Sequence, residues 1–284
     1  MMKTAIVTDT NSGFTQEEAD KLGIYLVPMP FIVDGTEYFE GVSCTYEHFF
    51  EMLEAGGEVS TTQPSPDAIT SLWDRLLESY DNIIHMPMSS ALSSSYATAT
   101  ALAAEYNGRV LVPDNKRISV TLRQAVLDAA ALSEKGETAE DILRMLEDTA
   151  LDSSIYLAVN TLELLKKSGR VTAAGAAVAA ILGIKPVLQI QGEKLDAFAK
   201  ARGMDNAKKV ILEALKKDRE TRFKGKNSYI AAAYSGEYEP AEKWLMQLRE
   251  YFGDDSIQIH KLPVSISCHV GAGVMAAAVI CKSE

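Results

Sequence analysis

The chain has 284 residues, of which 47% are hydrophobic and 24% are charged. Its 28 lysines and arginines against 39 aspartates and glutamates give a formal net charge of −11. At roughly 150 residues per domain the length predicts about two domains, and the composition is globular rather than disordered. The negative charge argues against a protein that wraps nucleic acid or lies on an anionic membrane.

Cysteine usage and the N-terminal segment favour a reduced, cytoplasmic chain. The three cysteines, Cys44, Cys268 and Cys281, cannot all pair with one another and show no spacing suited to zinc. Acidic residues arrive too early in the N-terminal segment for a secretory leader. The longest weakly polar stretch, residues 173–184, is about half of the roughly 20 residues that a membrane-spanning helix needs. We therefore expect no metal site of this kind and no insertion in a membrane.

In the first half of the chain, short β-branched runs alternate with helical patterns, as in stacked α/β units. The predicted strands are residues 3–8, 24–33, 36–39, 82–88 and 109–112. The first predicted helix follows the capping box of Thr15 and Glu18, and the second covers residues 46–55. The third begins at Pro66 after the N-cap Ser65, and the fourth ends near Gly108. Two more helices are predicted at 118–135 and 138–148. Asp34-Gly35 predicts a hairpin that pairs 36–39 antiparallel with 31–33. Between residue 57 and Ser65 we expect an exposed polar loop.

The pattern changes near residue 155, where a strand over 154–159 is followed by alanine-rich and lysine-rich helices. Further helices are predicted at 161–167, 172–182, 204–220 and 240–251, and further strands at 185–190, 194–199, 228–234, 256–262 and 274–281. The turn at Gly192-Glu193 indicates an antiparallel pair. We therefore predict two α/β domains: residues 1–155 with a largely parallel sheet, and residues 156–284 with a mixed or antiparallel sheet.

Serine and threonine side chains cluster in two predicted connections before helices. Residues 89–95 hold five serine hydroxyls in seven positions, between an apolar strand and a helix, which is an anion-binding arrangement. The alternative is a helix N-cap with spare serines. In the second cluster, Ser65 suffices as a cap, so Thr61 and Thr62 are left either for a ligand or for solvent.

His269 is expected in a turn between two apolar strands, where Gly271 and Gly273 let the backbone approach a ligand closely. Ligand contact or catalysis and a purely structural role both stay open for this side chain. Structural roles are favoured for the other histidines, His48, His85 and His260.

Arg170 follows a helix end and Arg202 follows a predicted strand. In an acidic chain they are candidates for binding a phosphate or an acidic partner, although solvated surface arginine is the commoner role. The sequence holds no nucleotide-binding glycine loop, no GxSxG elbow and no HExxH motif. A serine hydrolase that uses Ser93, His269 and an aspartate stays open as an alternative.

Taken together, these motifs resemble the DegV family of bacterial lipid-binding proteins across nearly the whole chain. The segments that carry the resemblance are Ile6-Val7-Thr8-Asp9, Asp34-Gly35 with Tyr38, Thr61-Thr62-Gln63-Pro64-Ser65, Met88-Ser89-Ser90-Ala91-Leu92-Ser93, Asp114, Leu162-Glu163-Leu164-Leu165-Lys166-Lys167-Ser168-Gly169-Arg170, Ile184-Lys185-Pro186-Val187-Leu188, Ala201-Arg202-Gly203, and His269 with Gly271 and Gly273. Their order and spacing make the match specific.

The resemblance implies a long-chain fatty acid held in a tunnel between two α/β domains, with no further cofactor and no catalytic activity of the chain itself. It implies that Thr61, Thr62, Ser93 and His269 meet the carboxylate, supported by Ser94, Ser95, Gly271 and Gly273. Several members of the family present the carboxylate to a separate fatty-acid kinase that makes the acyl phosphate. We expect Arg170 and Arg202 near the tunnel mouth, where they contact that partner or the phosphate.

The chain departs from the family pattern at Ser94, where the family has a glycine that permits unusual backbone angles, so the resemblance leaves the geometry of this loop open. A further alternative is a carrier of a small carbonyl compound bound through His269, by analogy with the substrate-binding part of dihydroxyacetone kinases. That alternative depends on fold-level analogy alone.

Overall fold

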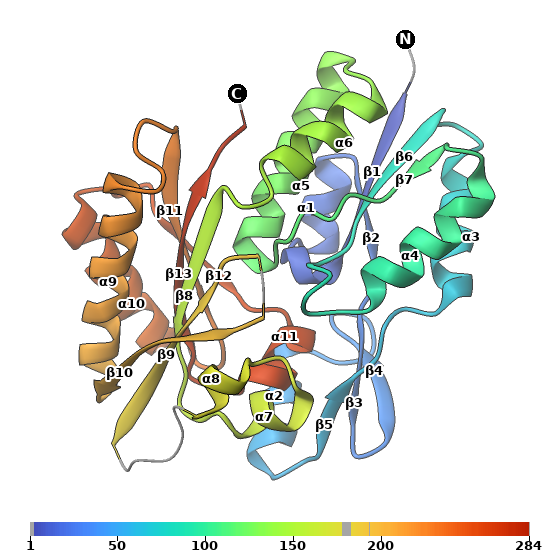
Figure 1. Cartoon of the computed structure of the whole chain (residues 1–284). Coiled ribbons are helices and arrows are strands. Elements are labelled where there is room, and N and C mark those ends of the chain that lie inside the picture. Colours follow the sequence, from blue (N-terminus) through green and yellow to red (C-terminus); the bar gives the residue numbers. More distant parts are fainter. Residues whose placement is uncertain (1–2, 178–182, 193, 284) are drawn as a thin grey trace. The chain divides into compact units, whose positions relative to one another are not determined.

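A computed structural model describes residues 3–177, 183–192 and 194–283 (Figure 1). The chain divides into two compact units: unit 1 takes Met1–Pro30, Thr62–Leu151 and Ser283–Glu284, and unit 2 takes Phe31–Thr61 and Asp152–Lys282. The expected boundary after residue 155 lies close to the crossing at Asp152. The segment Phe31–Thr61, which we expected in the N-terminal domain, instead clusters with unit 2.

Unit 1 contains a four-stranded sheet in which all neighbouring strands are parallel. The strand order is β2 (Ile24–Val27), β1 (Thr4–Asp9), β6 (Asn82–Met86) and β7 (Val110–Leu111). β1 is buried along its whole length, as expected for a central strand that is covered on both faces. This arrangement confirms the predicted parallel sheet.

Helices cover both faces of the parallel sheet (Figure 1). One face packs against α1 (Gln16–Lys21), α5 (Ser119–Lys135) and α6 (Ala139–Asp148), and the other against α3 (Pro66–Leu76) and α4 (Ser95–Ala103). The short 3-10 segments η1 (Thr10–Ser12) and η2 (Ala104–Tyr106) complete the unit. Both predicted start signals are present, because Thr15 and Glu18 form a capping box and Ser65 accepts a hydrogen bond from the N–H of Ala68.

The main sheet of unit 2 has six strands and is mixed, as predicted. The strand order is β10 (Asp196–Arg202), β9 (Ile184–Ile190), β8 (Ser153–Ala158), β13 (Met275–Cys281), β11 (Ser228–Tyr234) and β12 (Gln258–Lys261). Neighbours are antiparallel except β11 and β12, which are parallel. The predicted antiparallel pair after Gly192 is therefore confirmed as β9 and β10.

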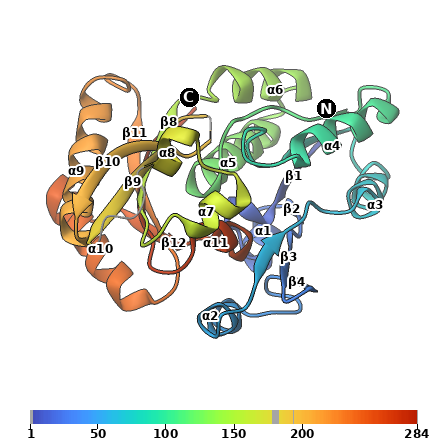
Figure 2. The ribbon, with the colours of Figure 1, turned by 60° about the horizontal axis from the view of Figure 1, so that its bottom comes forward.

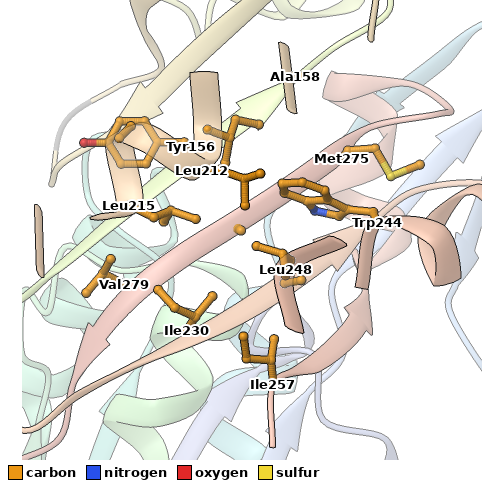
Figure 3. Close-up of a cluster of buried hydrophobic side chains, with 14 of the residues drawn as sticks. Tyr156, Ala158, Leu212, Leu215, Ile230, Trp244, Leu248, Ile257, Met275 and Val279 are labelled. Carbon is orange, nitrogen blue, oxygen red and sulfur yellow. The ribbon is translucent and has the colours of Figure 1, made fainter. Parts of the chain in front are cut away.

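Two long helices, α9 (Met204–Glu220) and α10 (Tyr238–Phe252), pack on one face of this sheet. Alternate residues of the central strands point to that face, which follows from the two-residue repeat of a strand. Trp244 lies within this core and donates a hydrogen bond from its indole nitrogen to Ala276 O at 3.1 Å (Figure 3). Packing in this core holds the six-stranded sheet in place, and the remaining elements of unit 2 are connected to its strands.

The segment Phe31–Thr61 adds a small sheet and a helix to unit 2 (Figure 2). Its elements are β3 (Pro30–Val33), β4 (Thr36–Phe39), α2 (Tyr46–Glu54) and β5 (Val59–Thr61), with sheet order β4-β3-β5. Asp34 and Gly35 have φ of 49° and 79°, as a type I′ hairpin turn requires. β5 pairs antiparallel with β3, so part of the expected polar loop is a strand. Phe31 and Phe49 of this segment pack with Val264 and Cys268, which explains its place in unit 2.

The described residues of unit 2 also form the short helices α7 (Glu163–Ser168), α8 (Ala173–Ala177) and α11 (Val264–Val270). The expectation of a turn at His269 is wrong, because His269 lies in the last turn of α11. Six of the seven residues of α11 are buried, so the segment shows no one-sided helical pattern in the sequence. Residues 178–182 of the expected helix 172–182, and residue 193 of the expected turn, lie outside the described residues.

Among the helices that the structure describes, none has both the length and the apolar character needed to cross a lipid bilayer. Within the same part of the chain, His, Cys, Asp and Glu side chains do not gather in groups of three or more that would hold a metal ion.

His85 of β6 makes the stability of unit 1 depend on pH. It is 2% exposed, its ring meets Trp73 edge-on with centroids 5.4 Å apart, and burial lowers its pKa to about 3. Below pH 6.5 the folded state therefore binds fewer protons than the unfolded state. The free energy of unfolding of unit 1 is highest above pH 6.5 and decreases as the pH falls toward 3.

We predict that the free energy of unfolding of wild-type unit 1 decreases by about 1.4 kcal/mol for each pH unit below pH 6, because of His85. A His85→Phe variant keeps the ring contact and lacks this loss. Urea unfolding at several pH values, followed by hydrogen exchange of β6 peptides, measures the difference. Equal pH slopes for the two proteins would contradict the role of His85.

Candidate functional site

Unit 2 contains a pocket of about 230 Å³ between β5, α7 and α11. Its lining residues are Val59, Ser60, Thr61, Leu164, Lys167, Ser168, Arg170, Cys268 and His269. The wall combines apolar side chains, hydroxyls, one imidazole and two cations. Such a wall offers apolar surface together with hydrogen-bond donors and positive charge.

Thr61 and His269 meet in this pocket, with Thr61 Oγ1 and His269 Nε2 3.0 Å apart. Thr61 is held in place by β5, where it pairs with Phe31 of β3, and His269 is held by α11. Burial, followed by the nearby positive charge of Arg170, lowers the pKa of His269 to about 4. The imidazole is therefore neutral at pH 7.

A neutral imidazole carries its proton on one nitrogen, and the surroundings indicate which one. His269 Nδ1 is buried and has no hydrogen-bond partner among the described residues. Because a buried N–H without a partner is rarer than a buried lone pair without one, this arrangement favours the proton on Nε2. Nε2–H then donates to Thr61 Oγ1, and the Thr61 hydroxyl is left to donate to a ligand oxygen.

The two cations of the pocket have different surroundings. Lys167 Nζ pairs with the Glu58 carboxylate and is largely exposed. Arg170 is half-buried, and its guanidinium donates to Ser168 O. Gly169 ends α7 with φ of 70°, which turns the chain so that Arg170 follows in the pocket wall. Arg170 therefore contributes a positive field beside His269.

Arg202 is placed differently from Arg170. It is exposed at the end of β10, where it pairs with Ile184 of β9, and it does not line the pocket. The structure thus assigns the two predicted partner-contacting arginines to different surroundings, one in the pocket wall and one at a strand end.

The two glycines after His269 are required by geometry. Gly271 has φ of 75° and ψ of −170°, a region that is essentially restricted to glycine. A Cβ on Gly273 would lie 2.3 Å from Asn160 Nδ2. Ser235 Oγ donates to Gly271 O at 2.6 Å, and Ser235 O accepts from the N–H of Gly273 at 2.8 Å. These contacts anchor the chain immediately after α11.

In unit 1, the serine-rich loop starts at the carboxyl ends of the parallel strands, where ligands of such sheets bind. Asp9, at the end of β1, accepts hydrogen bonds from the N–H groups of Asn11 and Met88. Burial raises the pKa of Asp9 to about 6, against the effect of these two bonds. Asp9 thus ties the start of the loop to the central strand.

Ser93, Ser94 and Ser95 form the N-terminal end of α4. Ser93 Oγ and Ser95 Oγ share a hydrogen bond of 2.9 Å, and Ser93 Oγ also accepts from the N–H of Ser95. Ser94 donates to Gln63 Oε1 at 3.0 Å. Its φ of −74° is open to any residue, so the glycine that the family has at this position is not needed for the geometry seen here.

The structure therefore brings Thr61, His269 and Arg170 together in unit 2, with Gly271 and Gly273 supporting them. Thr62 and the serine loop belong to unit 1, where Thr62 is exposed. Sequence reasoning did not identify the apolar wall formed by Val59, Leu164 and Cys268. Burial raises the pKa of the Cys268 thiol to about 12, so this thiol is neutral at pH 7 and forms part of the apolar wall. Its position next to His269 in the sequence is the one feature that could have indicated this role.

Comparison with known proteins places the chain in a family. A family model described as "Uncharacterised protein, DegV family" matches residues 3–282. The chain belongs to the DegV family. A DegV domain-containing protein from Deinococcus radiodurans is 29% identical over 278 residues, covering 98% of each chain.

Solved structures of DegV proteins share the whole fold. A fatty-acid-binding DegV family protein from Thermus thermophilus has a TM-score of 0.89 at 27% identity and covers 99% of this chain and 100% of its own. A fatty-acid-binding DegV protein from Streptococcus agalactiae has a TM-score of 0.89 at 25% identity and covers 100% of both chains. DegV from Bacillus subtilis, described as a fatty acid binding protein, has a TM-score of 0.86 at 25% identity and covers 99% of this chain and 100% of its own.

We predict that Gly273→Ala destabilises unit 2 by about 2–4 kcal/mol, because the added Cβ meets Asn160 and the positive φ is strained. The matched control is Gly253→Ala, where φ is also positive but a Cβ meets nothing within 4 Å; it costs about 1 kcal/mol. Urea unfolding followed by Trp244 fluorescence, with Trp73 replaced by Phe in both variants, compares them. Equal losses would show that Asn160 yields and that the close approach is unimportant.

Proposed function

We propose that this DegV protein binds a long-chain fatty acid and holds its carboxylate beside Thr61 and His269. The observation that carries the proposal is the hydrogen bond between these two side chains in a pocket with an apolar wall. The solved relatives described as fatty-acid-binding proteins support it.

The pocket suits the carboxyl end of such a ligand. A buried carboxylate is costly unless it receives hydrogen bonds or an opposite charge, and here the Thr61 hydroxyl and the field of Arg170 offer both. The volume of about 230 Å³ is below that of a site for a drug-sized ligand, so it takes the head and the first methylenes. Affinity then grows by ~0.8 kcal/mol for each further methylene that is buried.

We predict that Thr61→Val, which removes the hydroxyl but keeps the shape, weakens fatty-acid binding about tenfold or more, because a hydrogen bond to a charged group contributes ~1.5–3 kcal/mol. Ser60→Ala is the control: Ser60 lines the same pocket and neighbours Thr61 in β5. Fluorescent fatty-acid titration measures both affinities. Equal affinities of the two variants would contradict the assignment of Thr61.

The roles of Thr62 and Ser93 in carboxylate binding stay predictions, and Thr62→Val and Ser93→Ala test them in the same titration. The hydrolase alternative requires Ser93 as a nucleophile, whereas Ser93 Oγ is hydrogen-bonded to Ser95. Labelling of Ser93 by a fluorophosphonate probe, together with turnover of acyl esters by the pure protein, would support the hydrolase in place of the carrier.

We further propose that the chain has no catalytic activity of its own and presents the carboxylate to a separate fatty-acid kinase. The resemblance of its motifs to carrier subunits supports this proposal. Arg202 is exposed on a strand at the edge of the six-stranded sheet, where a partner protein can reach it. We propose that Arg170 acts from the pocket wall, beside the carboxylate that is to be phosphorylated.

We predict that Arg202→Ala lowers acyl-phosphate formation with the kinase severalfold and leaves fatty-acid affinity unchanged, because Arg202 does not line the pocket. Lys200→Ala, which removes the exposed cation two residues earlier in β10, is the matched control. Arg170→Ala lowers both acyl-phosphate formation and fatty-acid affinity. Coupled assays with the kinase and fatty-acid titrations measure them; a loss of fatty-acid affinity in Arg202→Ala would contradict its role at the partner surface.

A further inference from the structure

The segment Phe31–Thr61 holds α11 at both ends. At the C-terminal end, Thr61 contacts His269. At the N-terminal end, Glu40 Oε2 accepts a hydrogen bond of 2.8 Å from the backbone N–H of Val264, the first residue of the helix. Since α11 has only seven residues, the position of its first turn also determines where His269 lies.

Glu40 supplies a contact that the local sequence lacks. Pro263 precedes the helix and offers no side-chain acceptor for the free N–H groups of the first turn. The acceptor comes from a residue 224 positions away in the chain. The bond is charge-assisted when Glu40 is ionised, and such bonds are about twice as strong as neutral ones.

Among the described residues, a lysine, two cysteines and a tyrosine face Glu40. Lys261 of β12 lies near it and also pairs with Glu47 of α2 at 2.9 Å. Burial raises the pKa values of Cys44, Tyr46 and Cys268, so all three stay neutral at pH 7. Burial also raises the pKa of Glu40 to about 7, against the Val264 bond and Lys261.

We propose that Glu40 is a positioning residue of the carboxylate-binding pocket: as a carboxylate it fixes α11 through Val264, and on protonation it loosens the helix that carries His269. The proposal rests on the proposed fatty-acid function. The direction of the pH effect follows from the charge of Glu40, because the anionic acceptor is present above pH 7 and is lost as the pH falls. Fatty-acid affinity therefore decreases from pH 8 to pH 6.

The test is titration of a fluorescent long-chain fatty acid against the full-length protein between pH 6 and pH 8. Wild-type affinity falls about fivefold over this range, beyond any change that all variants share. Glu40→Gln binds at pH 8 as weakly as wild type does at pH 6 and lacks this fall. Glu47→Gln, which removes the other carboxylate beside Lys261, keeps the wild-type profile.

A stability measurement separates positioning from folding. Glutamine is a neutral isostere that avoids the burial of a charge, so Glu40→Gln unfolds at an equal or higher urea concentration than wild type at pH 8 while binding more weakly. A wild-type pH profile in Glu40→Gln overturns the proposal. Loss of binding in step with loss of stability also overturns it, because Glu40 would then be only structural.

Hydrogen exchange of the ligand-free protein makes the test independent of the ligand. At pH 8 the amides of α11 exchange faster in Glu40→Gln than in wild type, relative to those of β13. Unchanged exchange means that Glu40 does not hold α11. If wild type binds no fatty acid at any pH, the proposed function fails, while the exchange result still decides whether Glu40 positions the helix.

Discussion

The hydrogen bond between Thr61 and His269 is the contact on which the site depends. It joins two segments that lie 208 residues apart in the chain, and it forms only because Phe31–Thr61 folds onto the body of unit 2. That segment carries seven acidic residues and no lysine or arginine. Its ion pairs from Glu47 to Lys261 and from Glu58 to Lys167 connect it to the cations of the remaining part of unit 2.

In the proposed function, neutral donors contact the carboxylate directly, and the cations of the pocket wall act on it through their field. His269 is neutral at pH 7, and the Cys268 thiol beside it stays protonated. On this proposal, an entering carboxylate meets the Thr61 hydroxyl, which His269 already orients, and the positive field of Arg170. Because neutral donors lose less hydration on burial than cations do, such a site holds an anion without a large penalty when it is empty.

The sequence predicted those elements whose signals are local. The capping box at Thr15, the turn at Asp34-Gly35 and the N-cap Ser65 each fix a backbone conformation within four residues, and all three are present. β5 and α11 were missed because tertiary packing decides them. The residue pattern raised Thr61 and His269 as candidates and the resemblance assigned both to the carboxylate, but no spacing rule predicts their contact. No sequence pattern indicated a role for Glu40, because an isolated carboxylate in a polar stretch is expected to lie on the solvated surface.

The most direct test of fatty-acid binding is mass spectrometry of organic extracts from freshly purified protein, with the wild type and Thr61→Val prepared in parallel. The account predicts that the wild type releases close to one equivalent of long-chain fatty acid per chain and that Thr61→Val releases much less. Wild-type protein that yields no fatty acid, and that takes up none when it is added, would contradict the account.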